Sequence, residues 1–262
     1  MTRDQFRTIC RNRELCWGTV MLEYMTPQAV RTIARAGYDW IWIDNEHAAH
    51  SLDRVLECVR AARDLGVISI LRVAQLQYDR IAQALDIAPD GIIVPRIETV
   101  EQARMAVDCA KYPPIGKRGF GMRSTLFAPG VTSMAARIKD QNERILILQI
   151  ETPTGVSNAD AIVAAVGQHI DALFFGPADY QVTIGAPDQP NHAELDAATR
   201  KISDLARKHR LSNGVPVTSI NGAKLWIDRG YNLLTYLSDD SFFADHATKS
   251  REELRQFGSL TL

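Results

Sequence analysis

Five ionisable side chains stand at, or shortly after, the carboxyl ends of apolar runs that we predict to be β-strands. They are Asp44, His47, Arg72, Glu151 and Asp179. Carboxylates, an imidazole and a guanidinium together offer metal binding, proton transfer and anion recognition. If the strands form a parallel barrel, their carboxyl ends meet at one mouth and the five side chains converge on a shared site.

Glu151 and Asp179 are the candidate metal ligands. They lie one predicted βαβ unit apart, so their carboxylates can reach a common point from adjacent strands. Mg²⁺ and Mn²⁺ use one or two protein carboxylates together with water and substrate oxygens, whereas Zn²⁺ prefers nitrogen and sulfur ligands. We therefore predict Mg²⁺ or Mn²⁺, and other divalent ions such as Co²⁺ stay open. The alternatives are an ion pair between Glu151 and a neighbouring arginine, and a helix cap formed by Asp179.

His47 is the candidate acid/base residue. It follows a predicted strand directly, and Asp44 stands three residues before it. In a tight turn the Asp44 carboxylate can fix the tautomer of the imidazole, which is the arrangement of a proton-transfer pair. The alternative is that His47 binds a loop carbonyl.

Arg72 is the candidate anion-binding residue. It ends an otherwise apolar strand, so its guanidinium needs an anion or a carbonyl. A substrate carboxylate or enolate is one such partner. The alternative is a structural ion pair with Glu98 or Asp44.

The turn formed by Gly176, Pro177 and Ala178 joins a predicted strand to a predicted helix. Backbone N–H groups at such a junction bind carboxylates well. Gly176 and Ala178 each offer one N–H group, whereas Pro177 has none to donate. We expect this turn to hold a substrate carboxylate.

Eight short apolar runs, each followed by a turn and a stretch of helical periodicity, indicate repeated βα units. They cover residues 17–22, 40–44, 68–72, 91–95, 145–151, 172–177, 215–219 and 233–238. Their near-continuous hydrophobicity is typical of strands covered on both faces. We predict one α/β domain over residues 1–262, a single (βα)8 TIM barrel. A Rossmann-like sheet is the alternative, but no G-x-G-x-x-G motif follows the first run.

Other segments carry further expectations. Predicted helices over 27–37 and 52–66 stop at glycines, where a left-handed cap is most easily formed. The segment 111–130 is long and rich in glycine and proline, which is typical of an active-site loop. A carboxy-terminal helical segment at about 241–257 is a candidate for packing on a neighbouring subunit.

The composition favours a small-molecule partner. Thirty basic and 31 acidic side chains leave a formal net charge of -1, so no global field favours nucleic acid or an anionic membrane. The four cysteines contain no C-x-x-C pair, which indicates reduced thiols in a cytoplasmic protein. The amino terminus lacks the apolar run of a signal peptide, and no run is long enough to span a membrane.

The seven lysines all fall in predicted helices or loops. They are Lys111, Lys117, Lys139, Lys201, Lys208, Lys224 and Lys249. A Schiff-base aldolase needs a lysine that points inward from a strand. Carbonyl chemistry in this chain is therefore expected to depend on a metal.

Several motifs in series resemble the HpcH/HpaI aldolase and citrate lyase superfamily, in particular its metal-dependent pyruvate aldolases. They are ARAGYDWIWIDNEH (34–47), Arg72, IIVPRIETVEQA (92–103), YPPIGKRGFG (112–121), LQIET (148–152) and DALFFGPADYQVTIG (171–185). The resemblance implies a TIM barrel in which Glu151 and Asp179 bind the ion and a 2-oxo acid chelates it. It further implies that Arg72 stabilises the enolate and that His47, oriented by Asp44, transfers the proton.

The reaction implied by the resemblance is reversible cleavage of a 4-hydroxy-2-oxo acid to pyruvate and an aldehyde. The turn at Gly176 and Ala178 would hold the pyruvate carboxylate. Residues 122–130 depart from the family pattern, which keeps open oxaloacetate decarboxylation or macrophomate synthase-like chemistry on the same site. A barrel without catalysis is a further alternative. Relatives are commonly hexamers, so we expect a homo-oligomer.

Overall fold

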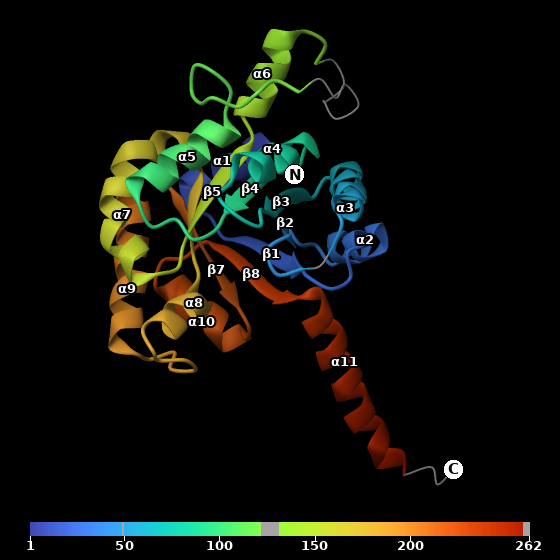
Figure 1. The fold of residues 1–262 in the computed structure, drawn as a ribbon. Helices are drawn as coiled ribbons and strands as arrows, with labels where there is room; N and C mark the ends of the chain where they lie inside the picture. The colour runs from blue at the N-terminus through green and yellow to red at the C-terminus, as the bar shows by residue number, and fades with distance from the viewer. Residues whose placement is uncertain (49, 122–130, 259–262) are drawn as a thin grey trace.

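The computed structural model describes residues 1–48, 50–121 and 131–258. Eight parallel strands pair in chain order, and the last pairs with the first, which closes a barrel. Helices surround this barrel (Figure 1). The predicted TIM barrel is confirmed.

The strands are β1 (Cys16–Met21), β2 (Trp40–Asp44), β3 (Ile68–Arg72), β4 (Gly91–Val94), β5 (Ile145–Ile150), β6 (Ala172–Phe175), β7 (Ser212–Val217) and β8 (Leu233–Ser238). Predicted and observed bounds agree at both ends of β2, β3 and β8. Strand β7 begins earlier than predicted, at Ser212, because Asn232 donates a 2.9 Å hydrogen bond to the buried Ser212 hydroxyl. Strand β6 ends earlier, at Phe175, because Pro177 is the first residue of a helix.

The helices are α1 (Arg3–Asn12), α2 (Pro27–Arg35), α3 (Leu52–Leu65), α4 (Tyr78–Asp86), α5 (Val100–Ala110), α6 (Met134–Asn142), α7 (Pro153–Val166), α8 (Pro177–Thr183), α9 (Ala193–Lys208), α10 (Ile220–Asp228) and α11 (Asp239–Leu254). The described part of the chain also contains the 3₁₀ turns η2 (Gly167–His169) and η3 (Arg255–Phe257). Gly66 ends α3 with φ of 69°, as the sequence predicted. Gly37 follows α2 with φ of 86°, which is also left-handed.

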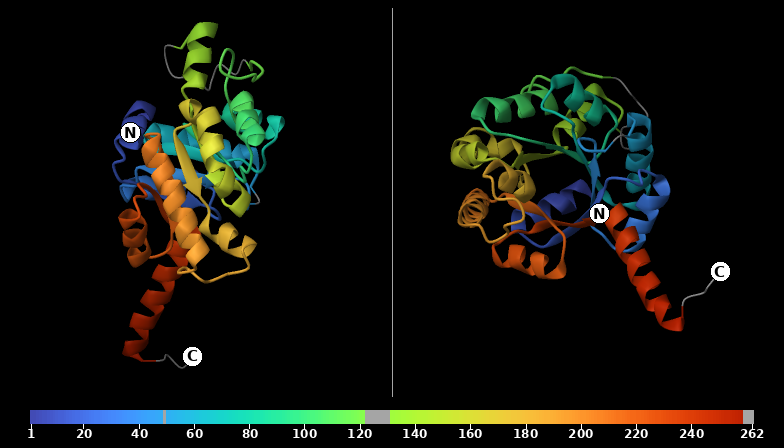
Figure 2. Two further views of the ribbon diagram at one scale, coloured as in Figure 1. Left: turned by 90° about the vertical axis from the view of Figure 1, so that its left-hand side faces the viewer. Right: turned by 60° about the horizontal axis from the view of Figure 1, so that its bottom comes forward.

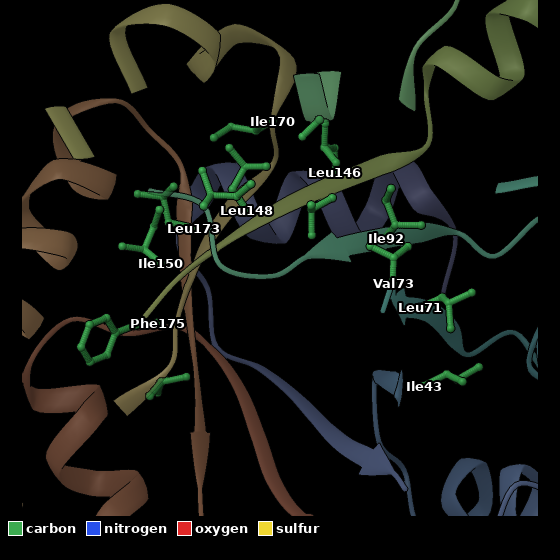
Figure 3. Close-up of a cluster of buried hydrophobic side chains, with 14 of the residues drawn as sticks. Ile43, Leu71, Val73, Ile92, Leu146, Leu148, Ile150, Ile170, Leu173 and Phe175 are labelled. Atoms are coloured by element: carbon green, nitrogen blue, oxygen red, sulfur yellow. The ribbon is translucent and has the colours of Figure 1, made fainter. Parts of the chain in front are cut away.

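An aliphatic layer lies between the barrel and its helices. Figure 3 shows part of it, including Leu71, Leu146 and Leu148, which are fully buried. These side chains point outward from the strands, whereas the residues that alternate with them point into the barrel. Burial on both faces explains why the strands read as continuous apolar runs.

Aromatic side chains fill the interior of the barrel. Phe6 of α1 contacts Trp40 at 6.4 Å between ring centroids, Trp40 contacts Phe174 at 6.4 Å, and Phe174 contacts Trp42 at 4.7 Å. A Cβ atom at Gly214 would lie 2.2 Å from the Phe174 ring, so this position requires glycine. The rings form a continuous column from α1 toward the carboxyl ends of the strands.

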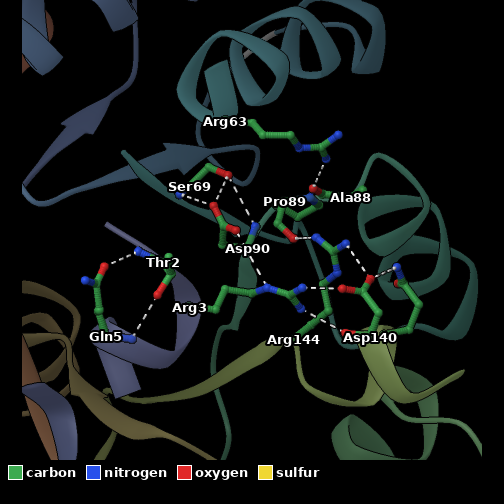
Figure 4. Close-up of polar contacts among 11 residues, drawn as sticks. Thr2, Arg3, Gln5, Arg63, Ser69, Ala88, Pro89, Asp90, Asp140 and Arg144 are labelled. Atoms are coloured by element: carbon green, nitrogen blue, oxygen red, sulfur yellow. Dashed lines mark hydrogen bonds and ion pairs between the residues drawn. The ribbon is translucent and has the colours of Figure 1, made fainter. Parts of the chain in front are cut away.

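Helix α1 covers the amino-terminal end of the barrel and is held there by ion pairs. Arg3 donates a 2.8 Å hydrogen bond to the carbonyl oxygen of Asp140, and Arg144 donates one of 3.1 Å to the Asp140 carboxylate (Figure 4). Arg7 pairs with Asp171 at 2.8 Å. The sequence analysis did not identify this helix as a cover.

The segment predicted as an active-site loop, residues 111–130, lies in its described part at this same amino-terminal end. Lys111 Nζ donates a 2.9 Å hydrogen bond to the carbonyl oxygen of Asn142, near the start of β5, and Arg118 pairs with Asp86 at 2.6 Å. Residues 111–121 follow helix α5 and precede strand β5, and such a connection lies at the amino-terminal end of the barrel, opposite the carboxyl ends of the strands. The expectation is therefore wrong for residues 111–121, and residues 122–130 lie outside the described residues.

Helix α11 extends away from the barrel (Figures 1 and 2). Phe242 near its start packs against Tyr38 and Tyr236, at 6.1 and 5.9 Å between ring centroids. Most described side chains after Phe242 are exposed, including Phe243 and Leu254. The predicted helical segment at 241–257 is thus observed. No helix in the described parts of the chain combines the length and apolar content needed to cross a membrane.

Candidate active site

The register of β2 and β3 places Asp44 directly beside Arg72. Arg72 Nε donates a 3.0 Å hydrogen bond to Asp44 Oδ1, and Nη2 donates to Oδ2. Arg72 Nη1 also pairs with Glu46 Oε2 at 3.0 Å. The guanidinium carbon lies 4.8 Å from the centre of the Trp42 ring, in a cation–π contact. The structural ion pair considered as an alternative for Arg72 is therefore present.

Asp44 does not contact the imidazole of His47. Its Oδ1 atom accepts hydrogen bonds from the backbone N–H groups of Glu46 (2.8 Å) and His47 (3.4 Å), so it shapes the turn. The His47 side chain is 64% exposed, and its Nε2 lies 4.0 Å from Glu46 Oε2. The expectation that Asp44 fixes the imidazole is wrong, because strand register gives this carboxylate to Arg72. Glu46 takes the place beside His47.

Glu151 is buried just after β5, and both of its carboxylate oxygens are bound. Oε1 accepts a 2.9 Å hydrogen bond from the backbone N–H of Arg96, and Oε2 accepts one from Gln149 Nε2. The pKa of Glu151 is raised to about 7, mainly by burial and then by the nearby charges of Asp179 and Glu46, while the hydrogen bond from Arg96 and the charge of Arg72 lower it.

Asp179 lies in the first turn of α8, and its side chain is 46% exposed. Its Oδ1 atom lies 3.9 Å from Arg96 Nη1. The N-cap position of α8 is occupied by Gly176, so the alternative that Asp179 caps this helix is not observed.

Glu151 and Asp179 suit a divalent cation. Both are carboxylates just beyond the ends of adjacent strands, and the charge of Asp179 contributes, after burial, to the raised pKa of Glu151. No group of three or more His, Cys, Asp or Glu side chains within the described residues is arranged to hold a metal. Two carboxylates leave most coordination positions of Mg²⁺ or Mn²⁺ to water and substrate oxygens, as these ions prefer.

The turn at 176–178 differs from expectation in one respect. The N–H of Gly176 donates a 3.1 Å hydrogen bond to the carbonyl oxygen of Ile150, so it is not free to bind a substrate carboxylate. A Cβ atom at Gly176 would lie 2.6 Å from Glu151 Oε2, so glycine makes room for that carboxylate. Pro177 and Ala178 are the first two residues of α8. The N–H of Ala178 has no acceptor within the helix and points to its amino-terminal end.

A cavity of about 220 Å³ opens among these side chains. Its lining consists of Val20, Trp42, His47, Arg72, Gln149, Phe174, Gly176, Pro177, Ala178, Asp179 and Pro216. The cavity therefore brings together six of the eight predicted site residues; Asp44 and Glu151 do not line it, and they contact the lining residues Arg72 and Gln149. The sequence analysis did not select Gln149 or Trp42. Gln149 stands two residues before Glu151 on one strand, and that spacing places both on the same face.

Comparison with known proteins agrees with this geometry. Residues 19–239 match the family described as HpcH/HpaI aldolase/citrate lyase. The chain belongs to this family. It is 31% identical to the hydroxypyruvate/pyruvate aldolase of Cupriavidus necator over 97% of this chain and 93% of that protein. It is 29% identical to the 5-keto-4-deoxy-D-glucarate aldolase of Klebsiella pneumoniae over 92% of this chain and 91% of that protein.

Solved structures show the same fold. An HpcH/HpaI aldolase from Desulfitobacterium hafniense superposes with a TM-score of 0.89, at 26% identity, over all of both chains. Macrophomate synthase superposes with a TM-score of 0.79, at 26% identity, over 94% of this chain and 87% of that one. The family assignment makes this protein a carbon–carbon lyase of the aldolase type.

Proposed function

We propose that this HpcH/HpaI family protein is a divalent-metal-dependent aldolase that reversibly cleaves a 4-hydroxy-2-oxo acid to pyruvate and an aldehyde. The observation that carries the proposal is the buried carboxylate of Glu151, whose pKa is raised to about 7 beside Asp179 and Glu46. An anion placed in this way gains from a bound cation. The names of the aldolase relatives support a pyruvate-type 2-oxo acid as the substrate.

Glu151 and Asp179 would hold the ion, and Mg²⁺ or Mn²⁺ fits them best, with Co²⁺ as a further candidate. When bound, such an ion supplies Lewis acidity that polarises the 2-oxo group of the substrate. Gln149 and the backbone of Arg96 hold the Glu151 carboxylate in place through its two oxygens.

Arg72 stabilises the negative charge that develops on the substrate. A guanidinium has five N–H groups, and Asp44 and Glu46 engage three of them, so two remain for the substrate. Because two carboxylates and the Trp42 ring fix its position, Arg72 does not need to reorganise during the reaction. The Ala178 N–H at the start of α8 is placed to bind the substrate carboxylate.

His47 moves the proton. Its imidazole lines the cavity and is open to solvent, so it can exchange protons with water as well as with the substrate. Glu46 Oε2, 4.0 Å from the Nε2 atom of the ring, is the carboxylate that stands beside it.

The test is exchange of the methyl protons of pyruvate with deuterium, followed by NMR. We expect exchange with Mn²⁺ or Mg²⁺, none with EDTA, and recovery when metal is restored. A panel of 4-hydroxy-2-oxo acids should then release pyruvate under the same conditions. Metal-loaded protein that neither exchanges these protons nor cleaves any of the acids would contradict the proposal and favour a barrel without catalysis.

A second candidate is enolpyruvate chemistry on another substrate, by decarboxylation of oxaloacetate or addition to a different acceptor. The structural similarity to macrophomate synthase favours keeping it. Both reactions use the same cavity, so oxaloacetate belongs in the assay panel. A kcat/KM for oxaloacetate well above that for every 4-hydroxy-2-oxo acid would favour this candidate.

We further propose that the protein is a homo-oligomer, a hexamer by family resemblance, in which α11 packs on a neighbouring copy. The exposed Phe243 and Leu254 on a helix that extends away from its own barrel support this arrangement. Light scattering coupled to gel filtration should give a multiple of the 29.2 kDa chain. Removal of residues 239–262 should reduce the number of chains in each particle.

A further inference from the structure

Arg96 follows strand β4 and has an unusual backbone conformation. Its φ is 55°, in the left-handed region that residues other than glycine, asparagine and aspartate rarely adopt. Its backbone N–H donates a 2.9 Å hydrogen bond to Glu151 Oε1. This bond ties the position of Arg96 to one of the candidate metal ligands. The strained backbone therefore places a guanidinium at the mouth of the site.

Among the described residues, the guanidinium of Arg96 has no partner within hydrogen-bond distance. Its side chain is 59% exposed, and the nearest carboxylate oxygen, on Asp179, lies 3.9 Å away, too far for a hydrogen bond. Arg72, in contrast, is nearly buried and bound by two carboxylates. The donors of Arg96 therefore remain available to a ligand that enters the mouth.

A divalent cation held by Glu151 and Asp179 would weaken the attraction between Asp179 and the guanidinium of Arg96. In the proposed aldolase reaction, the 2-oxo acid half of the substrate would lie in the 220 Å³ cavity against Arg72 and Ala178, and the aldehyde half would extend toward the mouth. A guanidinium with free donors binds carboxylate and phosphate groups well, because it offers paired charge-assisted hydrogen bonds.

We propose that Arg96 is a specificity-determining residue that binds an anionic group, a carboxylate or a phosphate, at the far end of the aldehyde half of the substrate. This inference rests on the proposed aldolase function. The site would then prefer aldehydes that carry a carboxylate or a phosphate, and Arg96 would take no part in the proton transfer.

The test compares aldol addition of pyruvate to matched aldehydes in the presence of Mn²⁺. Succinic semialdehyde is paired with butyraldehyde, and glyceraldehyde 3-phosphate with glyceraldehyde, so that the two arms separate carboxylate from phosphate recognition. The variant is Arg96→Asn, because asparagine tolerates positive φ and the fold should be retained. Arg96→Lys keeps the charge but loses the paired donors.

We expect Arg96→Asn to lower kcat/KM for at least one charged aldehyde by roughly 10- to 100-fold, the effect of one charge-assisted contact. A loss common to all aldehydes, acting through Glu151, cancels in the ratio of kcat/KM for charged and neutral aldehydes; this ratio should fall in Arg96→Asn, and Arg96→Lys should restore part of it. Arg207→Gln is the control, since Arg207 is 60% exposed and lies 3.6 Å from Asp204 in a similar exposed ion pair, on α9. It should leave both ratios unchanged.

A second measurement does not depend on turnover. Arg96→Asn removes a positively charged guanidinium that lies 3.9 Å from Asp179. The affinity of the protein for Mn²⁺, measured from the EPR signal of free Mn²⁺, should therefore rise several-fold in this variant. An unchanged affinity would contradict the placement on which the inference depends.

The outcomes separate the two proposals. Wild-type protein that adds pyruvate to none of the four aldehydes would count against the aldolase function itself. Active wild-type protein with the same charged-to-neutral ratio as Arg96→Asn would overturn only the role of Arg96. An equal loss for charged and neutral aldehydes would also overturn it, since Arg96 would then serve only to position Glu151.

Discussion

The carboxylate of Asp44 and the guanidinium of Arg72 are joined by two hydrogen bonds across the pairing of β2 and β3. Asp44 therefore positions the anion-binding residue, and Glu46 is the carboxylate next to His47. This division of roles distinguishes two groups of variants, because loss of Asp44 should disturb Arg72, whereas His47 has Glu46 as its neighbouring carboxylate.

Asp44→Asn should lower kcat by about 100-fold, since a shift of Arg72 by about 1 Å is enough for such a loss. Partial loss of a buried ion pair should also lower the melting temperature. Deuterium exchange into pyruvate and thermal unfolding measure the two effects, with Asp79→Asn as an exposed control that should change neither. Exchange at the wild-type rate in Asp44→Asn would contradict the role of Asp44 in positioning Arg72.

His47→Gln should leave stability unchanged, because the side chain is 64% exposed and makes no close contact. Proton transfer should fall by about 10²- to 10⁴-fold, the usual contribution of a general acid/base. Deuterium exchange into pyruvate measures this loss directly, and thermal unfolding checks the fold. Exchange at the wild-type rate would assign the proton transfer to another group.

Gly176→Ala should weaken metal binding. The new Cβ would lie 2.6 Å from Glu151 Oε2 and 2.7 Å from Glu151 Cβ, so the Glu151 side chain must move. We expect the Mn²⁺ affinity, measured by EPR, to fall at least about 10-fold, because ligand geometry sets the affinity. Gly222→Ala is the control, since its Cβ would meet only the Ser219 hydroxyl, at 3.0 Å. Equal Mn²⁺ affinity in the two variants would argue against Glu151 as a ligand.

Glu151→Gln should make the metal-free protein more stable at high pH. The folded pKa of Glu151, about 7, lies above its ordinary value of 4.5, so the wild type loses stability as pH rises from about 4.5 through 7. The amide removes this loss, and Gln149 can present its unpartnered Oε1 atom to the new N–H group. At pH 8 in EDTA the free energy of unfolding should rise by on the order of 2–3 kcal/mol.

At pH 4 the same substitution should bring no gain, because Glu151 is protonated in both folded and unfolded chains. With Mn²⁺ present the order should reverse, since the wild type gains stability from the ion and the variant binds it poorly. Urea unfolding at pH 4 and pH 8, with EDTA or Mn²⁺, measures all four values. A gain that is equal at both pH values would show that ionisation of Glu151 is not its cause.

The barrel was predictable because each strand is buried on both faces and each helix carries an apolar stripe. Strands β2 and β3 were predicted residue for residue, since apolar runs, interrupted only by the small polar Ser69, lead to Asp44 and Arg72. Strand β7 was predicted less well, because it begins with polar residues: the Ser212 hydroxyl and the backbone N–H of Asn213 form hydrogen bonds with Asn232, about 20 residues along the chain. Local polarity there resembles a loop.

Most residues of the candidate site lie together at the strand ends, but the pairing of Asp44 with Arg72 was predicted only as an alternative. Spacing along the chain joined Asp44 to His47, three residues away, whereas strand register joins Asp44 to Arg72, 28 residues away. Gly176 was selected for its N–H group, yet a barrel hydrogen bond uses that group and its missing side chain makes room for Glu151. Such contacts depend on tertiary packing, which the order of residues does not display.

The aromatic column from Phe6 to Trp42 fills the barrel below the cavity, so substrates reach the cavity from the carboxyl ends of the strands. Whatever binds deepest, against Trp42 and Arg72, must arrive first and leave last. In steady-state kinetics this predicts an ordered mechanism, in which the aldehyde departs before the 2-oxo acid and pyruvate inhibits cleavage competitively.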